Sequence, residues 1–368
     1  MITTAPLPAW ADLLRAARVE GTGAGVISPW LKPWDSGFLT PRSAWALAAL
    51  ATAVSRHRSR PARVLLPGWI CNQSLWPLRR TGADLTFLPV RPDGGMNWPA
   101  AETLGAPDMV VVVHTFGHAA DLKPARDFAD SRGALLVEDA AHALMPGAGI
   151  HEAGDVVLYS PHKLLAAPEG GIMAVRPRAE DWADAIAEAL GQPAPAPDDR
   201  RWLARRVIQG LVPDLLRPLL PQGGQEGFAT DPATHPMPPP AGPSLLSRRL
   251  LAVCDLPREA ARRRANDHAL RAVVRELADL RPLYPADGGV PYRLALRAAS
   301  PQAAAARYQA LRAAHLPVET WPDLPPEVSA DPRHADGALA LRRSVLLLPV
   351  HGTLSPGRLA RVYGAVLR

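Results

Sequence analysis

From about residue 43 onward, the sequence alternates between helix-like and strand-like segments. Residues 43–57 (SAWALAALATAVSRH) are rich in alanine and leucine and predict a helix, whereas residues 62–69 (ARVLLPGW) form a short apolar run ended by Pro-Gly, which is typical of a buried strand. The alternation continues with two further predicted helices, 74–83 and 122–133, and with predicted strands at 84–90, 108–117, 134–139, 155–160 and 171–175. Strands that alternate with helices of this length predict an α/β fold with a largely parallel sheet covered on both faces.

Polar clusters directly follow three of the predicted strands. They are HTFGH at 114–118, EDAAHA at 138–143 and SPHK at 160–163. In open parallel sheets, ligands lie beyond the carboxyl ends of the strands, where the loops begin. We therefore expect the chemistry of this protein at that edge of the sheet.

A smaller unit is predicted beyond a proline-rich stretch. Residues 221–243 hold seven prolines and cannot continue a helix or a central strand, so they predict a long loop or linker that is a candidate cover for the active site. The remaining helices and strands are predicted at 257–280, 290–298, 300–315 and 344–368. We expect a large domain over residues 1–225 and a smaller C-terminal α/β domain over residues 226–368.

Composition narrows the class of protein. The N-terminus lacks the features of a signal peptide and the longest apolar stretches are too short to span a bilayer, so we expect a soluble cytoplasmic protein with no membrane partner. Cys71 and Cys254 are too few for a zinc knuckle or an iron–sulfur cluster, and no metal is expected. The net charge of +6 favours an anionic partner such as a phosphate or a nucleotide-linked substrate. Because the arginines are scattered and accompany no nucleic-acid-binding motif, no nucleic acid is expected.

The segment YSPHKLLAAPEGG, residues 159–171, places Lys163 between polar residues and a Pro-Glu-Gly-Gly turn, just after an apolar run. A surface lysine is the ordinary interpretation, and the alternative is a lysine that holds pyridoxal 5′-phosphate covalently. Such a site also needs an acidic partner for the pyridine nitrogen, and hydroxyl and backbone N–H groups at a helix start for the phosphate. A flat or apolar group against the ring completes it.

Each of these groups has a candidate in the sequence. Asp139 ends a strand and is the candidate partner of the pyridinium nitrogen, and His142 is a candidate to lie over the ring or to hydrogen-bond its phenolic oxygen. Ser43 and Ala44 open a helix, so their N–H groups and the Ser43 hydroxyl are candidates for the phosphate, with Ser160 as a further hydroxyl. Taken singly, such residues are more often structural. Their order and spacing favour the site.

At this point the sequence resembles the DegT/DnrJ/EryC1/StrS family of aminotransferases, over roughly residues 36–368. Residues 111–143 are similar to the family's most recognisable block, in which a His-x-x-Gly turn leads to a helix, a strand and Glu-Asp-x-Ala-Gln/His. Residues 64–90 resemble its strand-helix-strand unit, residues 154–175 its lysine segment, and residues 346–356 its C-terminal Leu-Pro-x-His turn. The resemblance implies the fold of pyridoxal-phosphate enzymes of fold type I, which is aspartate-aminotransferase-like.

The resemblance also implies roles for the candidate residues. Lys163 would be the Schiff-base lysine and proton carrier, and Asp139 the pyridinium partner, so these two are the expected catalytic residues. His142 occupies the family's Gln/His position beside the ring. The phosphate residues would be Ser43 and Ala44, which stand where the family usually has Thr-Ala, and Ser160.

Three departures from the family pattern are visible. Ser160 lies three residues before Lys163, whereas the family's serine commonly lies five before its lysine. The ring-stacking position aligns with Cys71, while Trp69 is preferred on size. The family's Gly-Tyr-Asn segment, which reaches into the partner subunit's site, is not visible, and residues 221–249 occupy that region.

The leading hypothesis is therefore a homodimeric, pyridoxal-phosphate-dependent aminotransferase with sites at the subunit interface. It would move an amino group, from glutamate, to a keto group of a nucleotide-linked sugar in polysaccharide or natural-product biosynthesis. Two alternatives stay open: a related enzyme acting on a cyclitol, an aldehyde or another ketone, and a non-catalytic homologue that binds the cofactor. The presence of both Lys163 and Asp139 argues against the second alternative.

Overall fold

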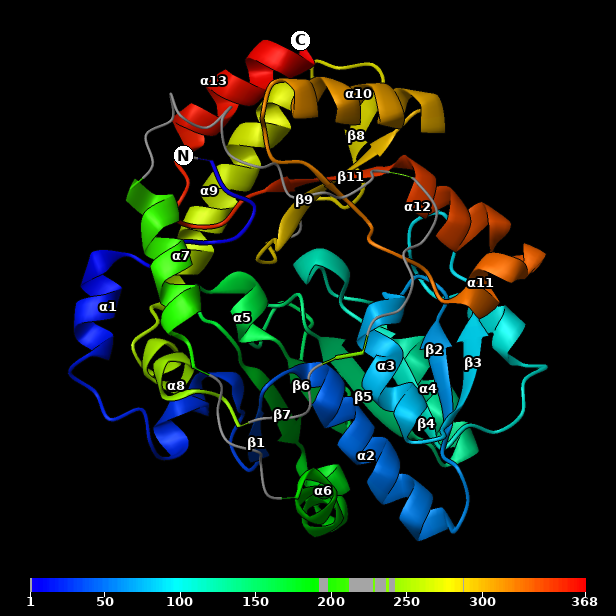
Figure 1. Cartoon of the computed structure of the whole chain (residues 1–368). Coiled ribbons are helices and arrows are strands. Elements are labelled where there is room, and N and C mark those ends of the chain that lie inside the picture. The colour runs from blue at the N-terminus through cyan, green and yellow to red at the C-terminus, as the bar shows by residue number, and fades with distance from the viewer. Residues whose placement is uncertain (1, 192–197, 212–227, 229–235, 238–241, 287) are drawn as a thin grey trace.

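The computed structural model describes residues 2–191, 198–211, 228, 236–237, 242–286 and 288–368. Most of the proline-rich stretch, which is the predicted cover of the active site, lies outside these residues, and so does the expected domain boundary at 225/226. The described residues form two sheets, a larger one and a smaller one above it (Figure 1).

The larger sheet has seven strands in the order β1-β7-β6-β5-β4-β2-β3. Strands β2 to β6 pair in parallel, and β7 runs antiparallel to both β6 and β1. The prediction of a largely parallel sheet is thus confirmed, whereas the edge strand β1 was not predicted. The strands are β1 (Ser36–Thr40), β2 (Arg63–Pro67), β3 (Asp84–Leu88), β4 (Met109–Val113), β5 (Leu135–Ala140), β6 (Val156–Tyr159) and β7 (Gly171–Val175).

Helices cover both faces of this sheet, because its central strands are apolar on both sides. In β2, Val64 and Leu66 pack toward the helices of one face, while Leu65 packs toward the helix of the other. The first face carries α2 (Ser43–Arg58), α3 (Trp76–Arg80) and α6 (Ala183–Leu190), and the second carries α4 (Leu122–Arg132). Helix α4 begins at an Asp121 side-chain cap and ends at Gly133, whose φ of +62° suits glycine.

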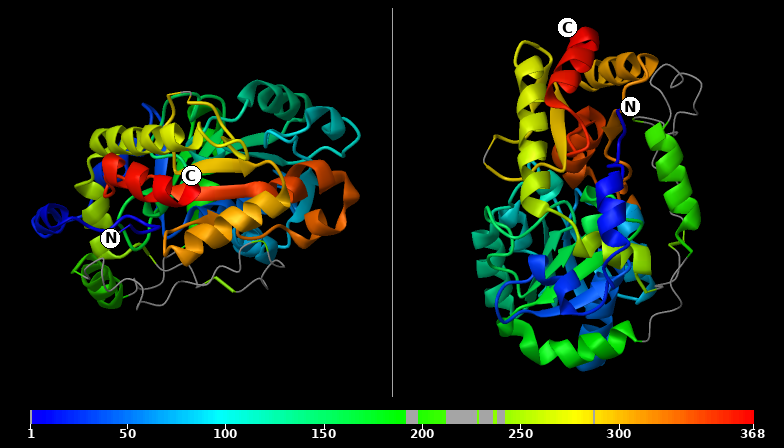
Figure 2. Two further views of the ribbon diagram at one scale, coloured as in Figure 1. Left: turned by 90° about the horizontal axis from the view of Figure 1, so that it is seen from above. Right: turned by 90° about the vertical axis from the view of Figure 1, so that its left-hand side faces the viewer.

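The smaller sheet has four antiparallel strands in the order β10-β11-β9-β8. Alternate residues of β9 face different cores: Leu294 and Leu296 pack toward the helices, and Ala295 packs toward the larger sheet. The strands are β8 (Leu280–Pro282), β9 (Arg293–Ala298), β10 (Glu319–Thr320) and β11 (Val345–Pro349). The helices of this part are α9 (Leu256–Val274), α10 (Pro301–Ala313), α11 (Pro326–Ala330), α12 (Ala340–Ser344) and α13 (Pro356–Leu367), of which α9, α10 and α13 lie on the outer side (Figure 2).

The start of the chain also packs on this smaller part. Ile2 is buried in the same hydrophobic cluster as Leu294, and the Thr3 carbonyl accepts a 2.8 Å hydrogen bond from Nε2 of His351. The remaining helices, α1 (Trp10–Ala16), α5 (Pro161–Leu164), α7 (Arg200–Leu211) and α8 (Leu245–Ala252), lie to one side of both sheets or between them (Figure 1). No helix among the described residues is long and apolar enough to cross a membrane.

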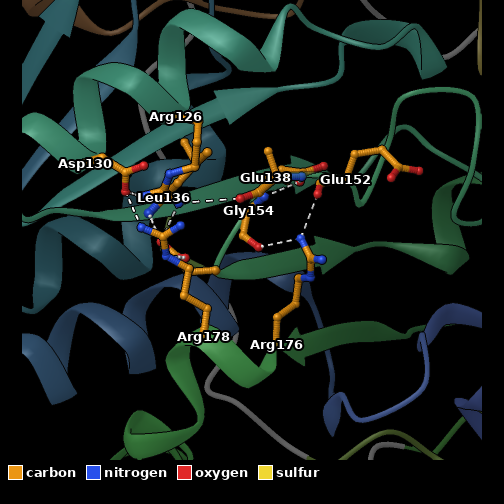
Figure 3. Close-up of polar contacts among 10 residues, drawn as sticks. Arg126, Asp130, Leu136, Glu138, Glu152, Gly154, Arg176 and Arg178 are labelled. Atoms are coloured by element: carbon orange, nitrogen blue, oxygen red, sulfur yellow. Dashed lines mark hydrogen bonds and ion pairs between the residues drawn. The ribbon is translucent and has the colours of Figure 1, made fainter.

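An ion-pair network fixes the amino-terminal edge of β5 and β6, which is opposite to the edge where the site was predicted (Figure 3). Arg126 contacts Asp155 at 2.9 Å and Asp130 at 2.7 Å, and Asp155 also accepts a 2.7 Å hydrogen bond from the Leu136 N–H. Arg178 joins the same two carboxylates. The arginines and aspartates of this network are therefore paired with one another, and through Asp155 they hold β5 and β6 in register.

Candidate active site

The three polar clusters predicted from the sequence meet at the carboxyl ends of β4, β5 and β6, below the smaller sheet (Figure 1). The first forms a tight turn after β4, the second includes Asp139 within β5, and the third forms the short helix α5 after β6. Parallel pairing of the three strands places these ends side by side. The fold thus brings the three polar clusters together at the edge of the sheet where the sequence predicted them.

Lys163 is the enclosed lysine of this site. The chain has only three lysines, and the other two are at the surface: Lys32 pairs with Glu152 at 3.2 Å, and Lys123 pairs with Asp127 at 2.6 Å and is 82% exposed. The Nζ of Lys163 lies 3.4 Å from His142 Nε2. Burial lowers the pKa of the Lys163 amine, so the neutral amine forms more easily than at the surface.

Asp139, which is half-buried like Lys163, lies within electrostatic reach of the Lys163 amine. Burial raises the pKa of the Asp139 carboxyl, and the charge of Lys163 lowers it in part, while Asp139 in turn raises the pKa of the Lys163 amine. One carboxylate oxygen accepts a 3.0 Å hydrogen bond from the Ala141 N–H. Among the described residues, no donor occupies the other oxygen, which leaves it for an N–H group of a ligand.

His142 is held as a neutral ring with a defined tautomer. Its Nδ1 accepts the N–H of Phe116 at 3.3 Å, so the ring proton is on Nε2, which faces Lys163. Burial, with the nearby charges of Lys163 and Arg293, lowers the pKa of His142 well below its usual value. The ring of Tyr292 stacks on that of His142 with centroids 4.6 Å apart. His142 can therefore donate one hydrogen bond from Nε2 into the site.

The turn after β4 has an uncommon backbone that serves this arrangement. Phe116 has φ +57°, in the left-handed region that side chains rarely adopt, and Gly117 has φ +87°. In this conformation the Phe116 N–H reaches His142 while its carbonyl accepts the Tyr292 N–H at 2.8 Å. A Cβ atom on Gly117 would lie 2.2 Å from the carbonyl oxygen of Val290, so only glycine fits there.

The start of α2 offers an anion site. The Oγ atoms of Ser43 and Ser160 lie 2.7 Å apart, and no side chain caps the helix. The helix can therefore use its first N–H groups, those of Ser43 and Ala44, to bind a ligand. Gly171 approaches so closely that a Cβ on it would lie 2.4 Å from the Ser43 nitrogen. The structure thus brings together the three residues predicted to bind phosphate, with the serine three positions before the lysine.

The two candidates for the ring-stacking position are placed differently. Trp69 is 1% exposed, and its ring is enclosed by Trp321 at 4.8 Å and Phe116 at 5.7 Å between centroids. Cys71 lies within the electrostatic reach of Lys163, and burial together with Asp323 raises the pKa of its thiol to about 12. Cys71 is therefore a neutral thiol near the amine. This placement favours Cys71 over Trp69, the residue preferred on size.

A family model matches residues 98–195, and it describes the DegT/DnrJ/EryC1/StrS aminotransferase family. Over these residues the chain is similar to that family. The matched residues include the turn after β4, the strand of Asp139 and the segment of Lys163. Members of the family are aminotransferases that use pyridoxal phosphate, so the match indicates an enzyme of this kind.

Solved structures agree with this fold over nearly the whole chain. The sugar aminotransferase CalS13 from Micromonospora echinospora matches with a TM-score of 0.66 at 17% identity, covering 99% of this chain and 100% of CalS13. PseC from Helicobacter pylori, an aminotransferase involved in the biosynthesis of pseudoaminic acid, matches with a TM-score of 0.69 at 11% identity, covering 99% and 98%. 3-Amino-5-hydroxybenzoic acid synthase matches with a TM-score of 0.67 at 17% identity, covering 99% and 98%. At these identities the match establishes the fold type.

The residues of this site fit pyridoxal phosphate on their own chemistry. A free carboxylate oxygen on Asp139 suits a pyridinium N–H, and the Nε2–H of His142 suits a phenolic oxygen. The uncapped start of α2, with two hydroxyls beside it, suits a phosphate. The amine of Lys163 lies 3.4 Å from Nε2 of His142 and within electrostatic reach of Asp139. The donors and acceptors thus match the cofactor's polar groups one for one.

Three arginines near the site were not predicted. Arg42 precedes α2, and Arg293 begins β9. Arg263, fully buried on α9, donates to the carbonyl of Leu164 at 2.7 Å and so ties the lysine segment to the smaller part. The sequence signal for Arg293 was weak, a charged residue at the start of an otherwise apolar strand. The sequence carried no signal for Arg263, because it lies in a run of three arginines, a pattern typical of a solvent-exposed helix.

Proposed function

We propose that this protein transfers an amino group from glutamate to the keto group of a nucleotide-linked sugar. The acceptor class is supported by the relatives of the same fold: CalS13 is a sugar aminotransferase, and DesI was solved with its TDP-sugar product. The net charge of +6 suits an acceptor that carries phosphates. The observation that supports the proposed catalytic role most directly is the convergence of β5 and α5, which puts Nζ of Lys163 3.4 Å from His142 Nε2, three residues after Asp139.

Bound pyridoxal phosphate would supply the electron sink that stabilises negative charge at the substrate carbon. In our proposal, Asp139 accepts the pyridinium N–H and keeps that ring nitrogen protonated. Ser43, Ser160 and the first N–H groups of α2 bind the phosphate, and Nε2 of His142 donates to the phenolic oxygen. These contacts fix the ring in one orientation toward Lys163.

Lys163 is the proposed proton carrier. Because burial lowers its pKa, a larger share of the Lys163 amine is neutral, and a neutral Nζ could accept a proton from the donor and hold it for return. The Asp139 charge limits this lowering. The position of the amine, 3.4 Å from Nε2 of His142, supports this role, since His142 is the proposed partner of the phenolic oxygen.

The experiment compares lysine variants of the purified holoenzyme. We expect the visible absorbance of the wild-type protein to bleach with glutamate and to return with a nucleotide-linked ketosugar. Lys163→Ala is expected to lose turnover completely, and Lys32→Ala and Lys123→Ala, the matched surface controls, to keep it. Turnover by Lys163→Ala, or an absorbance that glutamate never changes in the wild type, would refute the catalytic assignment.

The acceptor class has its own test. The bleached enzyme is mixed with nucleotide ketosugars, with cyclitol ketones and with simple aldehydes, and the return of absorbance is followed. Return with the nucleotide ketosugars at the lowest concentrations supports the proposal. Return with the other carbonyls alone contradicts it and favours the alternative acceptor.

A further inference from the structure

Three arginines lie around Lys163, and they differ in how much of each guanidinium is already used. Arg263 donates to the carbonyls of Leu164, Pro291 and Tyr292 and pairs with Glu259, so all its nitrogens have partners. Arg42 precedes the phosphate-binding start of α2, and its Nη1 lies 3.4 Å from His162 Nε2. Arg293 differs from both. It begins β9 instead of preceding α2, and within the described part of the chain only its Nε and Nη1 have hydrogen-bond partners.

Arg293 lies on the face of the smaller sheet that looks toward the larger one. It shares this face with Ala295, which packs into the core of the larger part, and it is only 3% exposed. Its Nε donates to Glu319 at 2.6 Å and its Nη1 to the Tyr292 carbonyl at 3.1 Å. Among the described residues, Nη2 has no acceptor.

A column of stacked groups connects Arg293 to the reaction centre. The guanidinium carbon lies 4.1 Å from the ring centroid of Tyr292, and the Tyr292 ring stacks on His142, whose Nε2 is 3.4 Å from Lys163. The charge of Arg293 contributes to the lowered pKa values of His142 and Lys163. Its positive charge is thus felt at the amine that takes part in the proposed reaction.

We propose that Arg293 binds a carboxylate of the amino-acid donor and so determines donor specificity. A buried guanidinium is costly unless anions surround it, and its one carboxylate partner, Glu319, is itself 26% exposed and leaves Nη2 free. Arginine is the side chain best suited to a carboxylate, because its N–H groups match the two oxygens. Glu319 holds the guanidinium in place from the other side. This inference rests on the proposed function.

The test separates donor binding from chemistry. α-Methylglutamate has no α-hydrogen, so its binding to the holoenzyme, followed by the absorbance of the bound cofactor, reports affinity without proton transfer. We expect Arg293→Met to weaken α-methylglutamate binding and to raise the KM for glutamate by about 10- to 100-fold, the range for one hydrogen bond to a charged group. Arg293→Lys, which keeps the charge without the fork, should lie between Arg293→Met and the wild type.

The matched control is Arg297→Met, which removes an arginine from the same face of the same strand, where it contacts the Pro92 carbonyl at 2.8 Å. This variant should bind α-methylglutamate as the wild type does. The acceptor KM and the cofactor content should be unchanged in every variant.

The inference is overturned if Arg293→Met binds α-methylglutamate as tightly as the wild type, or if Arg297→Met loses as much affinity. It is also overturned if only the acceptor KM rises, which would assign Arg293 to a carboxylate on the acceptor. If the wild type binds α-methylglutamate but never converts glutamate, the proposed function fails while the comparison of affinities still tests Arg293.

Discussion

The most quantitative prediction concerns Glu138, the neighbour of Asp139 whose side chain is completely buried. Its carboxylate accepts hydrogen bonds from His114 Nε2 at 2.9 Å and from the backbone N–H groups of His151, Ala153 and Gly154 at 2.6, 2.9 and 2.5 Å, of which the Gly154 bond is drawn in Figure 3. Burial alone would raise the pKa of Glu138, but these donors lower it to about 2 from an ordinary value of 4.5. The ionised form is therefore the one that the fold binds.

The magnitude follows from this lowered pKa. Lowering the pKa of Glu138 from 4.5 to about 2 corresponds to about 3 kcal/mol of stability, which is present above pH 4.5 and is lost as the pH falls toward 2. We expect Glu138→Gln, which cannot be ionised, to lower the free energy of unfolding by about 3 kcal/mol at pH 7. About 2 kcal/mol of the difference between variant and wild type should disappear by pH 3, because the wild type has by then lost most of this contribution.

Urea titrations at pH 7 and pH 3, followed by tryptophan fluorescence, measure the difference. The control is Glu152→Gln in the same loop. Glu152 is 52% exposed and, within the described part of the chain, forms an ion pair only with Lys32, so its loss should cost less than about 1 kcal/mol at either pH. A Glu138→Gln cost that is the same at pH 7 and pH 3 would show that the carboxylate's charge is not what the network binds.

Two further predictions test the backbone and the phosphate site. Gly117→Ala should lower the free energy of unfolding by about 3 kcal/mol, because the new Cβ meets the Val290 carbonyl and φ is positive. The control Gly82→Ala, at φ +76° but with nothing within 4 Å of the new Cβ, should cost about 1 kcal/mol. Equal costs in thermal unfolding would refute the steric argument. Ser160→Ala should weaken the binding of pyridoxal phosphate to the apoprotein about 10-fold in a fluorescence titration. The control Ser131→Ala, at an exposed position, should bind the cofactor with unchanged affinity. Unaltered affinity in Ser160→Ala would show that its hydroxyl does not bind the phosphate.

Much of the larger sheet could be predicted because its signals are local. The apolar run of β4 and the helix-forming residues of α2 each lie within one short stretch of sequence, and period and composition suffice to recognise them. Strand β1 was not recognised, since its residues Ser36–Thr40 are only partly buried and its partner β7 is more than 130 residues away. A strand at a sheet edge carries little hydrophobic pattern of its own.

The same distinction between local signals and long-range contacts applies to the site. The candidate residues could be chosen from the sequence, because Asp139 is near the end of β5, Lys163 is in the short helix after β6 and Ser43 begins α2, all positions that the alternation of strands and helices makes predictable. Only the tertiary structure decided what surrounds them. Arg293 reaches the amine through Tyr292 and His142, residues from three segments that meet only when the smaller sheet packs over the larger one. Local propensity encodes elements, whereas contacts between distant segments depend on how whole surfaces pack, and no short stretch of sequence specifies that.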